Sequence, residues 1–212
     1  MGQCSSCIRR FLPFLSDIEM SSTDQHAPTD ELLAEEAMPQ VHEIDAAMSA
    51  PSITIANDLK NVVTGFGLAL ADVPVEQDSA YWEWRISNHS GDGAALMFGV
   101  SNKRNSKFYE ILAESTVPPE KHGTKFMSPI SNLNDGDIVG VVVQQSEIPM
   151  IQLYVNGEIH DRVSRFRGTV FPALYLPQGS EMSATFLYRE DQYAKGPPTP
   201  NIPPLMAERS LM

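Results

Sequence analysis

The segment from Asp135 to Leu176 constrains the fold of this chain most strongly, because it contains two strand patterns in succession. A β-branched run from Ile138 to Val143, interrupted only by Gly140, is typical of a strand that is buried on both faces. Apolar and polar residues then alternate from Ile151 to Val155, which predicts a half-buried strand. The segment therefore favours a β-rich fold.

Asn156 and Gly157 follow the second of these patterns and predict a β-hairpin. Both central positions of a type I′ turn need a positive φ, which Asn and Gly tolerate best. A further strand is expected from Phe171 to Leu176 after a turn at Gly168. Proline donates no ladder hydrogen bond. Pro172 therefore predicts either that this strand lies at a sheet edge or that Pro172 stands at the start of the strand.

The rest of the chain adds short strands but no convincing long amphipathic helix. The strand expected from Ala80 to Ser87 alternates strictly, so Trp82, Trp84 and Ile86 share one face and both tryptophans are expected in the core. Residues 116–134 contain three prolines and a glycine and are expected to form a long loop. Further strands are predicted at residues 52–56, 61–64, 67–71, 94–100, 108–112 and 181–188. This pattern predicts an all-β fold, an antiparallel β-sandwich.

Composition divides the 212 residues into four parts. We expect a lipid-anchor and juxtamembrane segment over 1–20, an acidic flexible linker over 21–51, a β-sandwich domain over 52–190 and a proline-rich tail over 191–212. Residues 8–20 fit either an interfacial helix or an apolar linker. The two cysteines, Cys4 and Cys7, lie outside the expected core, so the domain has no disulfide framework.

Charge argues against nucleic acid as a ligand. The chain carries a net charge of −12, and its first fifty residues, with nine acidic and two basic side chains, contribute −7 of it. Such a balance repels polyphosphate. The sequence contains no apolar run of the roughly 18 residues that a membrane span needs, and no signal-peptide core. We therefore expect a cytoplasmic domain, in which the sequon at Asn88 occurs by chance.

The first seven residues fit the pattern for N-myristoylation, with Gly2 as acceptor and Ser6 at the hydroxyl position. One myristoyl chain binds membranes with an association constant of only about 10⁴ M⁻¹, so stable attachment needs a second signal. Cys4 and Cys7 are the expected palmitate acceptors. This predicts a peripheral, lipid-anchored protein at the cytoplasmic face of a membrane. An unmodified tail and a C-x-x-C metal or redox pair are the alternatives, although the chain has no further cysteine to complete a metal site.

Sequence motifs of catalysis are missing. The chain has no G-x-S-x-G, no H-E-x-x-H and no phosphate loop, and none of its five histidines shares a motif with a nucleophile. We therefore expect a protein that is not an enzyme and that uses no cofactor or metal. A lectin-like sandwich and an enzyme without a recognisable motif remain the alternatives.

Several of these segments resemble the SPRY domain family. They are, in chain order, Tyr81–Ile86, Met97–Val100, Gly136–Gly140, Leu153–Glu158 and Phe166–Ala173. The resemblance covers residues 62–186 and extends to small stand-alone members with a cysteine-bearing N-terminus. It implies a jelly-roll type sandwich that acts as a monomeric adaptor, binding a protein or peptide partner through loops at one end.

The predicted binding face combines residues 101–109 with residues 176–179. Its expected contacts are Lys103, Arg104, Lys107, Phe108, Tyr109, Leu176, Pro177 and Gln178. Further basic residues gather in two other segments, Lys121 with Lys125, and Arg162 with Arg165 and Arg167. A basic flank favours an acidic partner segment or an anionic membrane surface. The alternative is that these loops only collect solvated charge.

Overall fold

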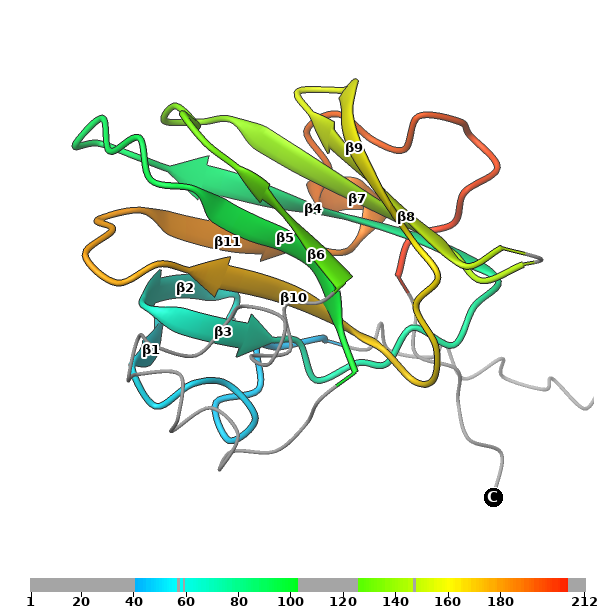
Figure 1. Cartoon of the computed structure of the whole chain (residues 1–212), viewed down its shortest axis with the longest axis horizontal. Helices are drawn as coiled ribbons and strands as arrows, with labels where there is room; N and C mark the ends of the chain where they lie inside the picture. Colours follow the sequence, from blue (N-terminus) through cyan, green and yellow to red (C-terminus); the bar gives the residue numbers. More distant parts are fainter. Residues whose placement is uncertain (1–40, 57, 59, 103–125, 147, 206–212) are drawn as a thin grey trace, which may run out of the picture. The chain divides into compact units, whose positions relative to one another are not determined.

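The computed structural model of the chain describes residues 41–56, 58, 60–102, 126–146 and 148–205, and these residues form two antiparallel sheets (Figure 1). The larger sheet has seven strands in the spatial order β1 (Ile53–Ala56), β2 (Val62–Gly65), β11 (Ser183–Leu187), β4 (Ser79–Ser87), β7 (Ile138–Gln144), β8 (Met150–Val155) and β9 (Glu158–Ser164). The smaller sheet has four strands in the order β3 (Gly67–Leu70), β10 (Phe171–Leu176), β5 (Leu96–Ser101) and β6 (Phe126–Ile130). A 3₁₀ helix, η3 (Glu190–Gln192), follows β11.

The two sheets enclose one main core, which is built around β4. Trp82 and Trp84 are both 0% exposed, and the ring of Trp84 lies 4.8 Å from that of Phe186. They join one cluster with buried residues of the smaller sheet, including Phe98 and Leu174. The predicted antiparallel β-sandwich is therefore confirmed, and so is the burial of both tryptophans.

The hairpin that the sequence predicts is also present. Asn156 and Gly157 have φ angles of +53° and +93°, as a type I′ turn requires. The preceding run forms β7, which is buried along nearly its whole length. Gly140 interrupts that run because a Cβ there would lie 2.6 Å from the hydroxyl oxygen of Tyr81 on the neighbouring β4.

Two features of the smaller sheet differ from the expectations or refine them. The long loop expected over 116–134 is wrong for residues 126–130, which form β6. Pro129 is tolerated there because β6 is an edge strand that pairs only with β5. β10 is an inner strand, and Pro172 lies near its start, where its carbonyl oxygen accepts the Ala71 amide at 3.0 Å. The strand predicted over 108–112 lies outside the described residues.

The folded domain begins earlier than the predicted boundary at residue 52. Residues 41–50, expected to belong to a flexible linker, cover the outer edge of β3. The amides of Asp45 and Ala50 donate to the carbonyl oxygens of Leu70 and Leu68, both at 2.8 Å. Ile44 is only 2% exposed. A segment with few large apolar residues is thus ordered because it satisfies the hydrogen bonds of an unpaired sheet edge.

The C-terminal segment is anchored on the other side of the larger sheet by Glu83. This β4 residue lies on the face opposite the tryptophans, yet it is 0% exposed. Its carboxylate accepts the amides of Ala194, Lys195 and Gly196 at 2.7, 3.0 and 2.7 Å, and the hydroxyl of Tyr81 at 2.9 Å. A buried carboxylate is stable here because four donors replace its water shell.

Beyond this anchor, residues 203–205 extend the sheet beside β4. β11 pairs with β4 only from Glu83 onward, so the backbone of Tyr81 is left for another partner. The Tyr81 amide donates to Pro203 and its carbonyl oxygen accepts from Leu205, both at 3.0 Å. Leu205 is 2% exposed. The proline-rich tail expected over 191–212 is therefore part of the packed domain as far as residue 205.

We expect Glu83→Gln to loosen this C-terminal anchor. The amide that replaces the carboxylate brings an NH₂ group toward backbone donors, which should cost about 1–3 kcal/mol of unfolding free energy. Thermal unfolding and trypsin cleavage after Lys195 measure the two consequences. Glu158→Gln, on exposed β9, is the control. Unchanged melting and cleavage in the Glu83 variant would contradict the anchoring role.

We expect Gly157→Val to destabilise the hairpin through backbone conformation alone. A Cβ at Gly157 would meet no atom within 4 Å, so steric overlap is not the cause. A β-branched residue at positive φ should cost about 1–2 kcal/mol or more, which lowers the melting temperature by several degrees. Gly157→Asn, which tolerates positive φ, should lose less. Equal stability of the Val and Asn variants would show that φ does not limit this position.

Candidate protein-interaction surface

Antiparallel pairing brings four loops to one end of the sandwich. Ser87 pairs with Ser183, and Val139 pairs with Val155, in the larger sheet. Leu176 pairs with Gly67 in the smaller sheet. The loops that leave these positions are residues 88–95, 131–137, 156–157 and 177–182. We call this end the acidic loop end, because these loops contain four acidic residues (Asp92, Asp135, Asp137 and Glu181) and no lysine or arginine.

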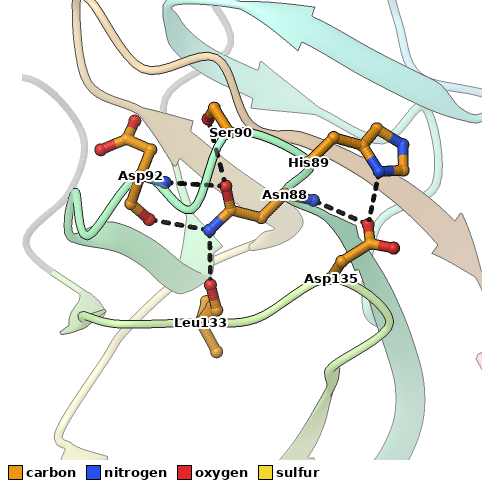
Figure 2. Close-up of polar contacts among 6 residues, drawn as sticks. All are labelled: Asn88, His89, Ser90, Asp92, Leu133 and Asp135. Carbon is orange, nitrogen blue, oxygen red and sulfur yellow. Dashed lines mark hydrogen bonds and ion pairs between the residues drawn. The ribbon is translucent and has the colours of Figure 1, made fainter.

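Asn88 ties two of these loops together, as Figure 2 shows. Its side-chain amide donates to the carbonyl oxygens of Asp92 at 2.8 Å and Leu133 at 2.7 Å. Its side-chain oxygen accepts the amide of Asp92 at 3.0 Å. Its own backbone amide donates to the carboxylate of Asp135 at 2.9 Å. One nearly buried side chain, 6% exposed, thus sets the relative position of residues 88–95 and 131–137.

A second set of contacts holds residues 131–137 against the hairpin. The Asp137 carboxylate accepts the Asn134 amide at 2.7 Å and the Asn156 side chain at 2.9 Å. Asn156 in turn accepts the Ile138 amide at 3.0 Å. These bonds fix the loops before any ligand arrives, which lowers the conformational entropy lost on binding.

The loops surround an open hollow of about 220 Å³, lined by Asn88, Gly91, Asp92, Gly93 and residues 132–135. The pKa of Asp92 is lowered, chiefly because the Ala94 amide donates to its carboxylate at 2.9 Å. The His89 ring lies 3.4 Å from the Asp135 carboxylate, although both side chains are exposed. The surface therefore presents negative charge at neutral pH.

The position of Asn88 also bears on the sequon. Both its side-chain donor and its side-chain acceptor are used within the domain, and the residue is nearly buried. A glycan on this nitrogen would break the bonds to Asp92 and Leu133.

The predicted contact residues that the structure describes fall at this end, with one correction. Pro177 is half-buried and Gln178 is exposed, so both are available to a partner. Leu176 is 0% exposed and lies within β10, so its side chain belongs to the core and not to a binding face. Asn88, Asp92 and Asp135 were not predicted as residues of a binding surface, because clusters of Asn, Asp and Gly in a sequence indicate only turns.

Most of the other predicted residues belong to parts of the chain that the structure does not describe. Lys103, Arg104, Lys107, Phe108, Tyr109, Lys121 and Lys125 lie outside the described residues, as do Gly2, Cys4 and Cys7. Strand β5, which precedes the first five in the chain, ends at Ser101, and Ser101 pairs with Phe171 at the far end of β10 from Leu176. Arg165 and Arg167 follow β9 at that same far end. The described charges beside Pro177 are thus acidic rather than basic.

Two further properties of the described residues bear on this surface. No group of three or more His, Cys, Asp or Glu side chains in them is placed to hold a metal ion. None of the helical residues in the described ranges forms a helix long and apolar enough to cross a bilayer. What the arrangement offers is a preorganised polar surface made of loops, which suits recognition of another molecule.

Comparison with known proteins agrees with this class of protein, a two-sheet antiparallel sandwich with loops gathered at its ends. No family model matches the chain. The crystal structure of the Drosophila melanogaster neuralized NHR1 domain has a similar fold, with a TM-score of 0.51 and 14% identity over 70% of this chain and 98% of that domain. This similarity concerns the fold alone.

Two proteins with similar sequences indicate a narrower class of protein than the fold similarity does. The human SPRY domain-containing protein 7 is 24% identical to this chain over 156 residues, which cover 70% of the chain and 77% of the relative. The Gallus gallus SPRY domain-containing protein 7 is 23% identical over the same shares. Together with the fold, these relatives support a SPRY domain in this chain.

Proposed function

We propose that the chain is a non-enzymatic adaptor that binds a protein partner through the acidic loop end and is held at a membrane by its acylated N-terminus. The observation that carries the binding proposal is the convergence of four loops, three of which (88–95, 131–137 and 156–157) are tied together by Asn88, Asp135 and Asp137. SPRY domains generally mediate protein–protein interaction, which supports this proposal.

The charge of the acidic loop end indicates which kind of partner segment would bind there. The sequence predicted an acidic partner from basic residues that lie outside the described ranges or at the other end of the sandwich. Around Pro177 and Gln178 the described charges are Asp92 and Glu181, and the described residues there include no base. A basic partner segment fits this surface, with an association rate that falls as salt rises.

The membrane part of the proposal rests on Gly2, Cys4 and Cys7 and on the need for two signals. Myristate at Gly2 supplies a weak, reversible membrane visit. Palmitate at either cysteine then converts that visit into stable attachment. The domain would be presented at the cytoplasmic face, on a tether formed by the residues that precede 41.

We expect the paired substitution Pro177→Ser and Gln178→Arg to weaken partner capture. The arginine would face a basic partner and repel it, while exposed loop positions contribute little to stability. Proximity labelling in cells, with thermal melting of the purified variant, measures both effects. Glu76→Gln, exposed in the loop that precedes β4, is the control. An unchanged set of labelled proteins would overturn the placement of the site.

We expect Gly2→Ala to release the protein from membranes, because the cysteines then lose the transient visit that allows their acylation. Fractionation and incorporation of an alkyne-bearing myristate analogue measure attachment and modification separately. Replacement of Cys4 and Cys7 with serine should keep myristate and leave only weak binding. A Gly2→Ala protein that stays in the membrane fraction would refute the lipid anchor.

A further inference from the structure

The opposite end of the sandwich has a second hollow, which we call the Phe166 hollow. It is open, has a volume of about 620 Å³, and is lined by Ile148, Pro149, Ser164, Arg165, Phe166 and Arg167. Pockets that bind ligands commonly measure about 300–1,000 Å³. The hollow lies where β8 begins and β9 ends, so it is separate from the acidic loop end.

The floor of the Phe166 hollow is rigid. Phe166 is 2% exposed, and its ring lies 6.2 Å from that of Phe126. The Arg165 amide donates to the Pro149 carbonyl oxygen at 2.8 Å, which joins the two segments that form the hollow. A built surface of this kind keeps its shape without a ligand.

The backbone of residues 165–168 leaves two charged side chains exposed. Arg165 has a φ of +69°, a conformation that non-glycine residues seldom adopt, and Gly168 follows with a φ of +81°. Phe166 points into the core while Arg165 and Arg167 on either side are exposed. The strain at Arg165 is tolerated because the burial of Phe166 and the bond to Pro149 hold the loop in place.

The rim of the hollow combines an apolar side chain with unpaired positive charge. Ile148 is 66% exposed, more than Val41 or Ile159, the other large apolar side chains that stand out in solvent among the described residues. Neither Arg165 nor Arg167 forms an ion pair with a described residue, whereas Lys60 and Arg189 each do so. In a chain with a net charge of −12, two guanidinium groups that have no ion-pair partner among the described residues form an unusual local surface beside an exposed isoleucine.

We infer that the Phe166 hollow is a second binding surface, which takes an acidic peptide segment of a partner protein with one apolar side chain. Arg165 and Arg167 would bind carboxylates of the segment, for which the planar guanidinium is well suited. Ile148 would contact the apolar side chain and lose its exposure to water. A concave surface fits a peptide better than it fits the flat surface of a membrane. With the acidic loop end, this gives the domain two binding surfaces of opposite charge.

The test uses the full-length chain and a fluorescein-labelled synthetic peptide, Glu-Asp-Glu-Leu-Glu-Asp-Glu. The wild-type chain should bind it, as measured by fluorescence anisotropy, and should bind the analogue with Ser in place of Leu more weakly. The paired substitution Arg165→Gln and Arg167→Gln should weaken binding about tenfold or more. Ile148→Ser, at an exposed position, should weaken binding without lowering the melting temperature.

Control variants separate this inference from the proposed function. Arg85→Gln, at the exposed position of the otherwise largely buried β4, and the Pro177→Ser and Gln178→Arg pair should bind the acidic peptide as the wild type does. Failure of the wild type to bind the peptide, or equal binding by the Arg165 and Arg167 variant, overturns the inference and leaves the acidic loop end untouched. A further experiment measures retention of the full-length chain on vesicles of phosphatidylcholine and phosphatidylserine. Retention on them that needs Arg165 and Arg167, without peptide binding, also overturns the inference and assigns the surface to a membrane.

Discussion

Burial of both faces of β4 is the constraint on which the rest of this domain depends. On its inner face, Trp82 and Trp84 are fully enclosed between the two sheets. On its outer face, Glu83 is just as completely buried beneath residues 194–196. A strand buried on both faces has no tolerance for slippage, because a shift by one residue would move a carboxylate into the apolar core. The register of β7 and β11 on either side of β4 is thereby set, and the positions of the loops follow from that register.

The loops matter for function because an antiparallel sandwich sends them to two ends. One end carries acidic side chains on a framework held by Asn88, and the other carries Arg165 and Arg167 beside an exposed Ile148. The acidic loop end and the Phe166 hollow lie at opposite ends of the strands, and exposed charges farther apart than about 8–10 Å are largely screened from each other by salt. The proposed adaptor, which would join two different partners, needs its two binding surfaces apart. The hydrogen bonds of Asn88 fix the loops of the acidic loop end. The contacts that hold Arg165 at positive φ fix the rim of the Phe166 hollow.

The candidate sites were harder to predict than the fold, and particular residues show why. Pro177 and Gln178 were predicted as contacts and are accessible, whereas Leu176 beside them is buried, because it is the last residue of β10 and its side chain faces the core. Asn88 looked like part of an ordinary turn, since its hydrogen-bond partners Leu133 and Asp135 are more than forty residues away. The exposed Ile148 carried no signal at all, because a single apolar residue in a loop is usual on protein surfaces.

The sequence by itself determined strands β4, β7 and β8 and the hairpin turn, because those depend on local properties: alternation in β4 and β8, the apolar run of β7, and the tolerance of Asn156 and Gly157 for positive φ. Only the tertiary structure decided which unpaired edges and faces would be covered. Residues 41–50 fold because β3 has a free edge, and residues 193–205 fold because Glu83 and the backbone of Tyr81 need partners. Neither segment has an apolar pattern that would reveal it, since backbone hydrogen bonds, which every residue can form, hold both in place.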